Sequence, residues 1–160
     1  MKLSSRDIAF IVLCGLIMFL SIGQRHSFGL YLIPVTSDWS WGRETFSIAI
    51  ALQNLVWGAA QPFAGMLADK IGSKRVMALG GAFYALGVVL MPYSNDGVLF
   101  AITAGLFVGL GLSGTAFGIV YGAVGKAVAP ERRPAALGLV GAIGGAGQLL
   151  MLPVNMTLIE

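Results

Sequence analysis

Long stretches without a charged side chain constrain this chain more than any other feature of its sequence. Charged residues make up 11% of the 160 and leave uncharged runs over residues 8–24, 45–68, 76–95, 97–125 and 134–159. All but the first exceed the length of about 18 residues that marks a candidate membrane-spanning helix, and the first qualifies when Arg25 is included. The sequence therefore predicts a membrane protein.

The runs are apolar on every face, whereas the strands of a membrane barrel alternate apolar and polar residues over about ten positions. A helix satisfies its own backbone N–H and C=O groups in lipid. We therefore predict an all-α membrane protein without a soluble domain. Its five transmembrane helices are expected at approximately residues 7–34, 43–68, 74–93, 97–125 and 134–158. A signal peptide over residues 1–24 is the alternative for the first run, although no small-x-small cleavage site follows it.

Basic residues are distributed unevenly among the connections between these spans. Eight of the ten Lys and Arg residues lie on one side: Lys2, Arg6, Lys70, Lys74, Arg75, Lys126, Arg132 and Arg133. Because cytoplasmic loops carry the excess of Lys and Arg, we expect a cytoplasmic amino terminus. The net charge of +3 then reflects topology, and no nucleic-acid partner is expected. One cysteine, Cys14, and one histidine, His26, indicate no disulfide, metal site or cofactor.

Uncharged polar side chains inside the runs are candidates for substrate binding, because facing lipid would be unfavourable for them. Asn54 and Gln61 are seven residues apart and so share a helix face. Gln61 precedes Pro62, where a kink is expected. Tyr121 and Gln148 lie in the fourth and fifth spans. Whether these groups line a wet cavity or only join helices stays open.

Arg25 and His26 lie within the first span, where a charge at mid-membrane costs at least about 2.5–3.5 kcal/mol. The Arg25 guanidinium is permanently charged, and its bidentate fork fits a carboxylate. His26 could hydrogen-bond the same anion or relay a proton. Two alternatives stay open: Arg25 reaches the outer interface or Asp38 through its long stem, or it pairs with a segment outside this chain.

The connection after the second span reads GMLADKIGSKRV. It resembles the cytoplasmic loop signature of the Major Facilitator Superfamily, carried here by Gly65, Asp69, Lys70, Gly72, Lys74 and Arg75. A loop this short needs a glycine such as Gly72 for its turn, and Asp69 can accept hydrogen bonds from the N-terminal N–H groups of a neighbouring helix. The resemblance implies that Asp69 and its basic neighbours latch the two halves of a transporter together on the cytoplasmic side. A plain positive-inside loop would explain the lysines but neither Asp69 nor the glycines.

Three further segments, SFGLYLIPVTSDWSWGRETFS, QPFAGMLAD and ERRPAALGLVGAIGGAGQ, resemble bacterial relatives of monocarboxylate carriers and oxalate/formate exchangers. The last segment opens the fifth span with a helix-packing pattern. It comprises Arg133, Ala136, Gly138, Gly141 and Gly145. Small residues at such spacings let helix backbones approach closely.

The resemblance implies two six-helix bundles with the substrate between them. The chain would then be a partial N-terminal bundle over residues 1–160, without the second half. Its implied function is alternating-access transport of small organic anions such as monocarboxylates across a bacterial inner membrane, with proton coupling as one option. A drug or neutral-solute transporter of the same superfamily and a non-transporting truncated scaffold are the alternatives. An enzyme is not expected, because neither G-x-S-x-G nor H-E-x-x-H occurs.

Overall fold

A computed structural model describes residues 5–159, which form helices joined by short turns, with no strand in that range. Lys2, assigned above to the cytoplasmic side, lies outside the described residues. The elements are α1 (Ser5–Ser27), η1 (Phe28–Tyr31), α2 (Leu32–Asp38), α3 (Arg43–Ile71), α4 (Ser73–Leu90), η2 (Met91–Tyr93), α5 (Gly97–Phe100), η3 (Ala101–Phe107), α6 (Val108–Thr115), α7 (Phe117–Ala127), η4 (Pro130–Arg132) and α8 (Arg133–Ile159). The all-α prediction is therefore confirmed over this range.

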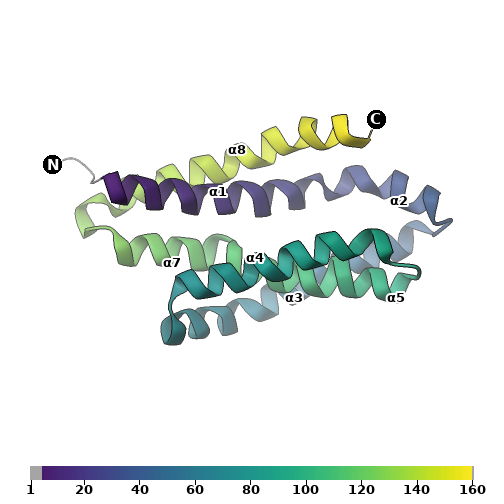
Figure 1. The fold of residues 1–160 in the computed structure, drawn as a ribbon, viewed down its shortest axis with the longest axis horizontal. Coiled ribbons are helices and arrows are strands. Elements are labelled where there is room, and N and C mark those ends of the chain that lie inside the picture. The colour runs from purple at the N-terminus through teal and green to yellow at the C-terminus, as the bar shows by residue number, and fades with distance from the viewer. Residues whose placement is uncertain (1–4, 160) are drawn as a thin grey trace.

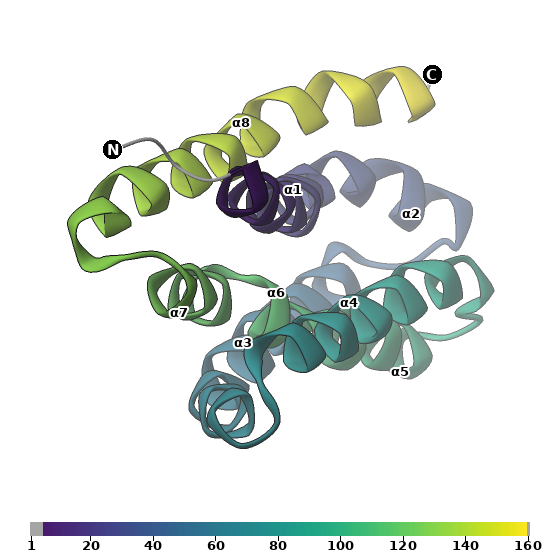
Figure 2. The ribbon, with the colours of Figure 1, turned by 60° about the vertical axis from the view of Figure 1, so that its left-hand side comes forward.

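The helices run roughly along one long axis (Figure 1). α1 packs along α8, while α6 packs against both α3 and α4. Figure 2 shows α1, α2 and α8 on one side of the molecule and α3 to α6 on the other. Both groups use glycines at their crossings: a Cβ built on Gly80 of α4 would lie 2.8 Å from the Cα atom of Gly114 on α6. Such contacts are possible only where no side chain separates the backbones.

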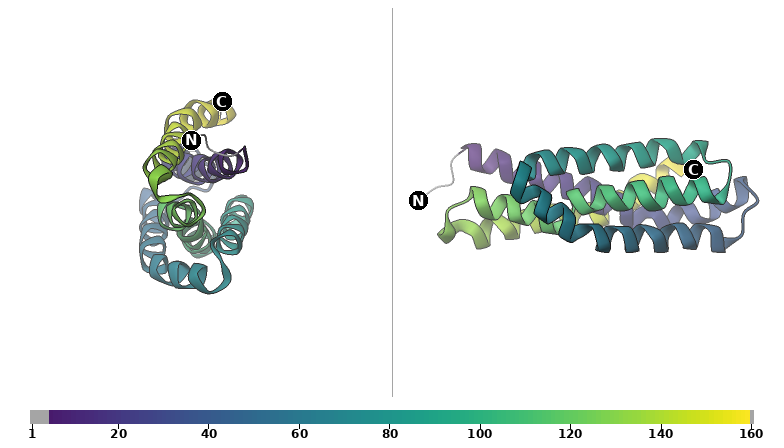
Figure 3. Two further views of the ribbon diagram at one scale, coloured as in Figure 1. Left: turned by 90° about the vertical axis from the view of Figure 1, so that its left-hand side faces the viewer. Right: turned by 90° about the horizontal axis from the view of Figure 1, so that it is seen from below.

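Four stretches of the described chain are long and apolar enough to cross a membrane: Asp7–Asp38, Ser73–Tyr93, Gly97–Ala127 and Pro130–Ile159. The remaining predicted span, residues 43–68, is also helical, as part of the 29-residue α3. It does not join the four because the amides Gln53, Asn54 and Gln61 lower its hydropathy. α3 continues through Pro62 and changes direction in its C-terminal part (Figure 3). Its crossing of the membrane stays a prediction.

Two spans differ in detail from their predicted form. The first ends at Asp38 instead of residue 34, because Pro34 falls in the first turn of α2, where its missing N–H needs no intrahelical partner. The fourth, expected as one helix, contains a π-helical stretch, η3, and an extended residue, Ala116, with φ −90° and ψ −172°. This break leaves the carbonyl of Thr115 without its helical partner. The nearest side-chain donor is the Ser21 hydroxyl of α1, which lies 3.4 Å from that carbonyl and 2.8 Å from the carbonyl of Ile17.

Candidate functional site

Arg25 of α1 reaches across to α3. Its Nη2 atom donates a hydrogen bond to Oδ1 of Asn54, and its guanidinium carbon lies 4.9 Å from the ring centroid of Trp57. Asp38 is at the far end of α2, about 20 Å further along at 1.5 Å per residue, which is beyond the reach of an arginine side chain. The contacts of Arg25 are therefore with α3 and not with Asp38, and no described carboxylate forms an ion pair with it.

Two donors in this cluster have no acceptor within hydrogen-bond reach among the described residues: Nε of Arg25 and Nε1 of Trp57. Both nitrogen atoms are buried, although the Arg25 side chain as a whole is half-buried and Asn54 is exposed. Leaving a buried donor unpaired costs about 1–3 kcal/mol, so two at one contact call for an explanation. The cluster lies at the surface of the described bundle and combines a fixed positive charge with unused donors.

Trp57 was not predicted as a site residue. Its position three residues after Asn54 places both on one face of α3, and this spacing is the feature of the sequence that could have identified Trp57 as a site residue. The sequence could not show that this face meets Arg25, because Arg25 lies on a different helix, 29 residues before Asn54.

His26 does not belong to this cluster. One residue advances an α-helix by about 100°, so His26 points to another side of α1 than Arg25. Its Nδ1 atom lies 2.9 Å from the carbonyl oxygen of Ile22, and its side chain is exposed. A neutral ring that donates through Nδ1 keeps Nε2 as a free acceptor.

The other predicted binding residues lie apart from Arg25. Oε1 of Gln61 on α3 is 2.8 Å from the position of a Cβ on Gly118, next to the break before α7. Tyr121 packs edge-on against Phe117, with ring centroids 5.6 Å apart. The Tyr121 hydroxyl fills the space where a side chain on Gly141 would stand. Gln148 is half-buried on α8.

A second polar network joins α1 to α8. Gln24 and Asn155 exchange hydrogen bonds through their amides, at 3.2 Å and 3.1 Å. The Tyr31 hydroxyl donates to Oδ1 of Asn155. Gln24 and Tyr31 also line a cavity of about 440 Å³, together with Asp38 and Trp39 at the far end of α2. The predicted site included none of these residues, because nothing in the sequence pairs Gln24 with a residue 131 positions later.

At the opposite end of the bundle, Asp69 accepts a hydrogen bond from Nζ of Lys126 at 2.6 Å. We expected the N–H groups of a helix N-terminus as its partner, but among the described residues the partner is a lysine at the C-terminal end of α7. Both side chains are largely exposed, so the pair is well solvated. Lys70 is also exposed.

The rest of the loop motif forms the turn between α3 and α4. Gly72 has φ +93°, a backbone conformation that residues with a side chain rarely adopt. Its N–H donates to the Ala68 carbonyl at 3.0 Å. This is the kind of turn for which the sequence predicted a glycine. Lys74 lies over the ring of Phe10, 5.7 Å from its centroid. Arg75 is exposed, and a Cβ on Gly65 would meet nothing within 4 Å.

The predicted packing residues of α8 have unequal roles. Nε of Arg133 donates to the Val128 carbonyl at 3.2 Å, and Ala136 is buried. Gly141 faces Tyr121, whereas Cβ atoms on Gly138 and Gly145 would meet nothing within 4 Å. Among the glycines of this span, Gly144 and Gly147 make the close approach to α1.

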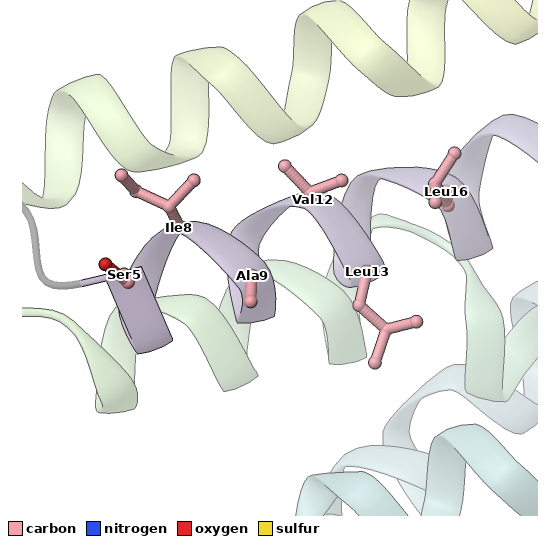
Figure 4. Close-up of a pocket in the computed structure, with 6 residues that line it drawn as sticks. All are labelled: Ser5, Ile8, Ala9, Val12, Leu13 and Leu16. Atoms are coloured by element: carbon pink, nitrogen blue, oxygen red, sulfur yellow. The ribbon is translucent and has the colours of Figure 1, made fainter.

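The N-terminal half of α1 carries an apolar surface hollow of about 550 Å³ (Figure 4). Its lining consists of Ser5, Ile8, Ala9, Val12, Leu13 and Leu16. With one hydroxyl and five apolar side chains, it offers no group that would select a charged solute.

These features define a class: a multi-pass helical membrane protein with a half-buried arginine between two of its helices. The Major Facilitator Superfamily matches residues 13–160, and the chain belongs to that family. No solved structure matches the chain.

Several of its curated relatives are transporters of anions. An uncharacterized MFS-type transporter, YcxA, of Bacillus subtilis is 24% identical over 96% of this chain and 38% of its own length. The oxalate:formate antiporter of Oxalobacter formigenes is 28% identical over 94% of this chain and 35% of its own length. Monocarboxylate transporter 2 of Mus musculus is 30% identical over 65% of this chain and 22% of its own length. The chain thus spans well under half the length of these relatives.

Proposed function

We propose that the chain is the N-terminal part of a secondary active transporter for small organic anions such as monocarboxylates. The observation that carries this proposal is Arg25, a permanent cation inside a membrane span with no described acid beside it. A charge in that position needs compensation, and an anionic solute supplies it when it binds. The guanidinium suits a carboxylate in particular. Relatives named for oxalate, formate and monocarboxylates support the same solute class.

In this proposal the protein is a carrier and not an enzyme, and it works by alternating access between this bundle and a second one. α3 is the second of five spans, the amino terminus is cytoplasmic, and the protein resides in a bacterial inner membrane. The exposed side of Asn54 faces the substrate path, to which Gln61, Tyr121 and Gln148 contribute at other depths and His26 from another side of α1. His26 is the proposed proton relay if transport is coupled to protons.

The loop motif serves the cycle at the cytoplasmic end. Asp69 and Lys126 are exposed and already paired there. We propose that this charged group contacts the second bundle in one of the two transport states and releases it in the other. A drug or neutral-solute carrier is less favoured, because neither solute would compensate the charge of Arg25.

Uptake by proteoliposomes tests this proposal. The product of the complete gene is reconstituted, and uptake of radiolabelled formate, oxalate and lactate is compared with that of a neutral sugar. We expect carboxylate uptake that Arg25→Gln abolishes. Arg25→Lys should raise KM about tenfold or more, because an ammonium group cannot form the bidentate pair. Sugar uptake alone, or an unchanged KM in Arg25→Lys, would refute the proposal.

A further inference from the structure

The contact between Asn54 and Arg25 has a role of its own in substrate binding, which rests on the proposed function. The Nε–H and one Nη2–H of an arginine point the same way from one edge of the guanidinium, and a carboxylate binds such an edge with two parallel hydrogen bonds. In this structure Asn54 bonds Nη2, while the neighbouring Nε has no acceptor. Asn54 has one amide oxygen, so it can take at most one of the two donor positions that a carboxylate fills on this edge.

Asn54 is held in this position from its own helix. Its Nδ2 atom donates to the carbonyl of Ile50, one turn earlier on α3, at 2.9 Å. This bond fixes the amide so that the oxygen, and not the NH₂ group, faces Arg25. Because Asn54 is exposed, an incoming solute can reach its amide from the surface, whereas the buried Nε of Arg25 becomes accessible only when that amide moves away.

Trp57 restrains the other side of the guanidinium. Its ring lies under Arg25 and packs against the buried cluster that contains Phe46, Phe100 and Leu112. A cation over an indole face is held by the ring quadrupole, which keeps the guanidinium plane fixed while its edge changes partner. The unpaired Nε1 of Trp57 is a further donor beside the same charge.

We infer that Asn54 is a built-in competitor of the substrate: it occupies one donor of Arg25, and the transported carboxylate displaces it to bind Nε and Nη2 together. The competitor is neutral and binds through one oxygen, so a charged, planar, two-oxygen group outcompetes it. A neutral solute with a single carbonyl gains nothing by the exchange. Asn54 thereby sets both the affinity of the site and its preference for carboxylates.

Two substitutions at Asn54 separate competition from simple support. Asn54→Ala removes the competitor, so we expect the Kd for carboxylate to fall several-fold. Asn54→Asp supplies a second oxygen and a charge to the same edge. It creates an internal carboxylate, and we expect the Kd to rise about tenfold or more. If Asn54 only positioned Arg25, Asn54→Ala would weaken binding instead.

The assay is equilibrium binding of radiolabelled formate, oxalate and lactate to the detergent-purified product of the complete gene. Ser47→Asp is the matched control, because Ser47 is exposed on the same face of α3, about 10 Å from Asn54 along the helix. It adds the same charge outside hydrogen-bond reach of Arg25 and should change the Kd much less than Asn54→Asp. Thermal unfolding of each variant identifies any that misfold, in which case Asn54→Ser replaces Asn54→Ala.

The outcomes distinguish this inference from the proposed function. Tighter binding in Asn54→Ala together with weaker binding in Asn54→Asp supports the competitor role. Weaker binding in both, or equal effects of Asn54→Asp and Ser47→Asp, overturns it while carboxylate transport stands. Binding with this pattern but without uptake overturns the transport proposal alone. No binding of any of the three carboxylates to the unmodified protein overturns both.

Discussion

Replacing Gly147 by alanine is expected to separate α1 from α8. A Cβ on Gly147 would lie 2.3 Å from the carbonyl oxygen of Phe19 and 2.7 Å from its Cα atom. Both are backbone atoms of α1, so neither can rotate away. Ordinary C···O contacts are about 3.3–3.6 Å, and the helices must therefore move apart by about 1 Å at this crossing.

The energetic effect has two opposing parts. A gap of 0.5–1 Å forfeits about a quarter to a half of each dispersion contact across it, and overpacking of this kind costs about 1–3 kcal/mol. Alanine is favoured over glycine within a helix by about 1 kcal/mol. Because the clash is with backbone, the upper part of the packing range applies. We expect a net destabilisation of about 1–2 kcal/mol for Gly147→Ala.

The single cysteine makes this measurable. Cys14 of α1 is buried in a cluster with Ala136 and Val140 of α8, so a thiol-reactive dye reports when the two helices part on heating. Gly145→Ala is the matched control, because a Cβ there meets nothing within 4 Å and only the helix preference changes. Gly147→Ala should melt at a lower temperature than the unmodified protein, and Gly145→Ala at the same temperature or higher. Equal melting of the two variants would refute the reasoning.

Two more predictions concern the turn between α3 and α4 and the Asp69–Lys126 pair beside it. Gly72→Ala forces a side chain onto φ +93° and should destabilise the protein by about 1–3 kcal/mol in the same dye assay, whereas Gly65→Ala, where the space is open, should not. Lys126→Ala removes the exposed partner of Asp69 and should lower stability by less than about 1 kcal/mol. If that loss is larger, or persists undiminished in molar salt, the pair is not the solvated surface contact described here.

The sequence predicted where the helices lie better than it predicted which helices pack against one another. Uncharged runs locate the spans because a segment in lipid needs apolar side chains and backbone hydrogen bonds within the same helix. Both requirements can be judged from one segment of sequence. Which face of a helix meets which partner is not local. When a run is apolar all round, its periodicity does not single out a packed face. Gly138 and Gly145 were therefore named as packing residues although a Cβ on either would meet nothing within 4 Å.

The site was predictable to the extent that its members are polar in apolar surroundings. Arg25 and Asn54 stood out on that ground, and the structure brings them together. Trp57 did not, because an indole is ordinary in a membrane helix. The partner of Asp69 was missed for a different reason: Lys126 was assigned to a positive-inside loop, which explains its side of the membrane but not its contact.

Two of the amides that lower the hydropathy of α3 also attach it to its neighbours. Gln53 is buried and donates to the Ala104 carbonyl of η3 at 2.9 Å, and Asn54 accepts from Arg25. Both side chains are hydrogen-bonded to neighbouring elements, so α3 can cross the membrane with its partners even though its composition alone does not mark it as a span. In a Cys14→Ala background, Ser40→Cys before α3 and Lys70→Cys at its end should then react with an impermeant thiol reagent from opposite sides of the membrane. Labelling of both from one side would show that α3 does not cross, and would place the loop motif and Arg25 in a different topology from the one proposed.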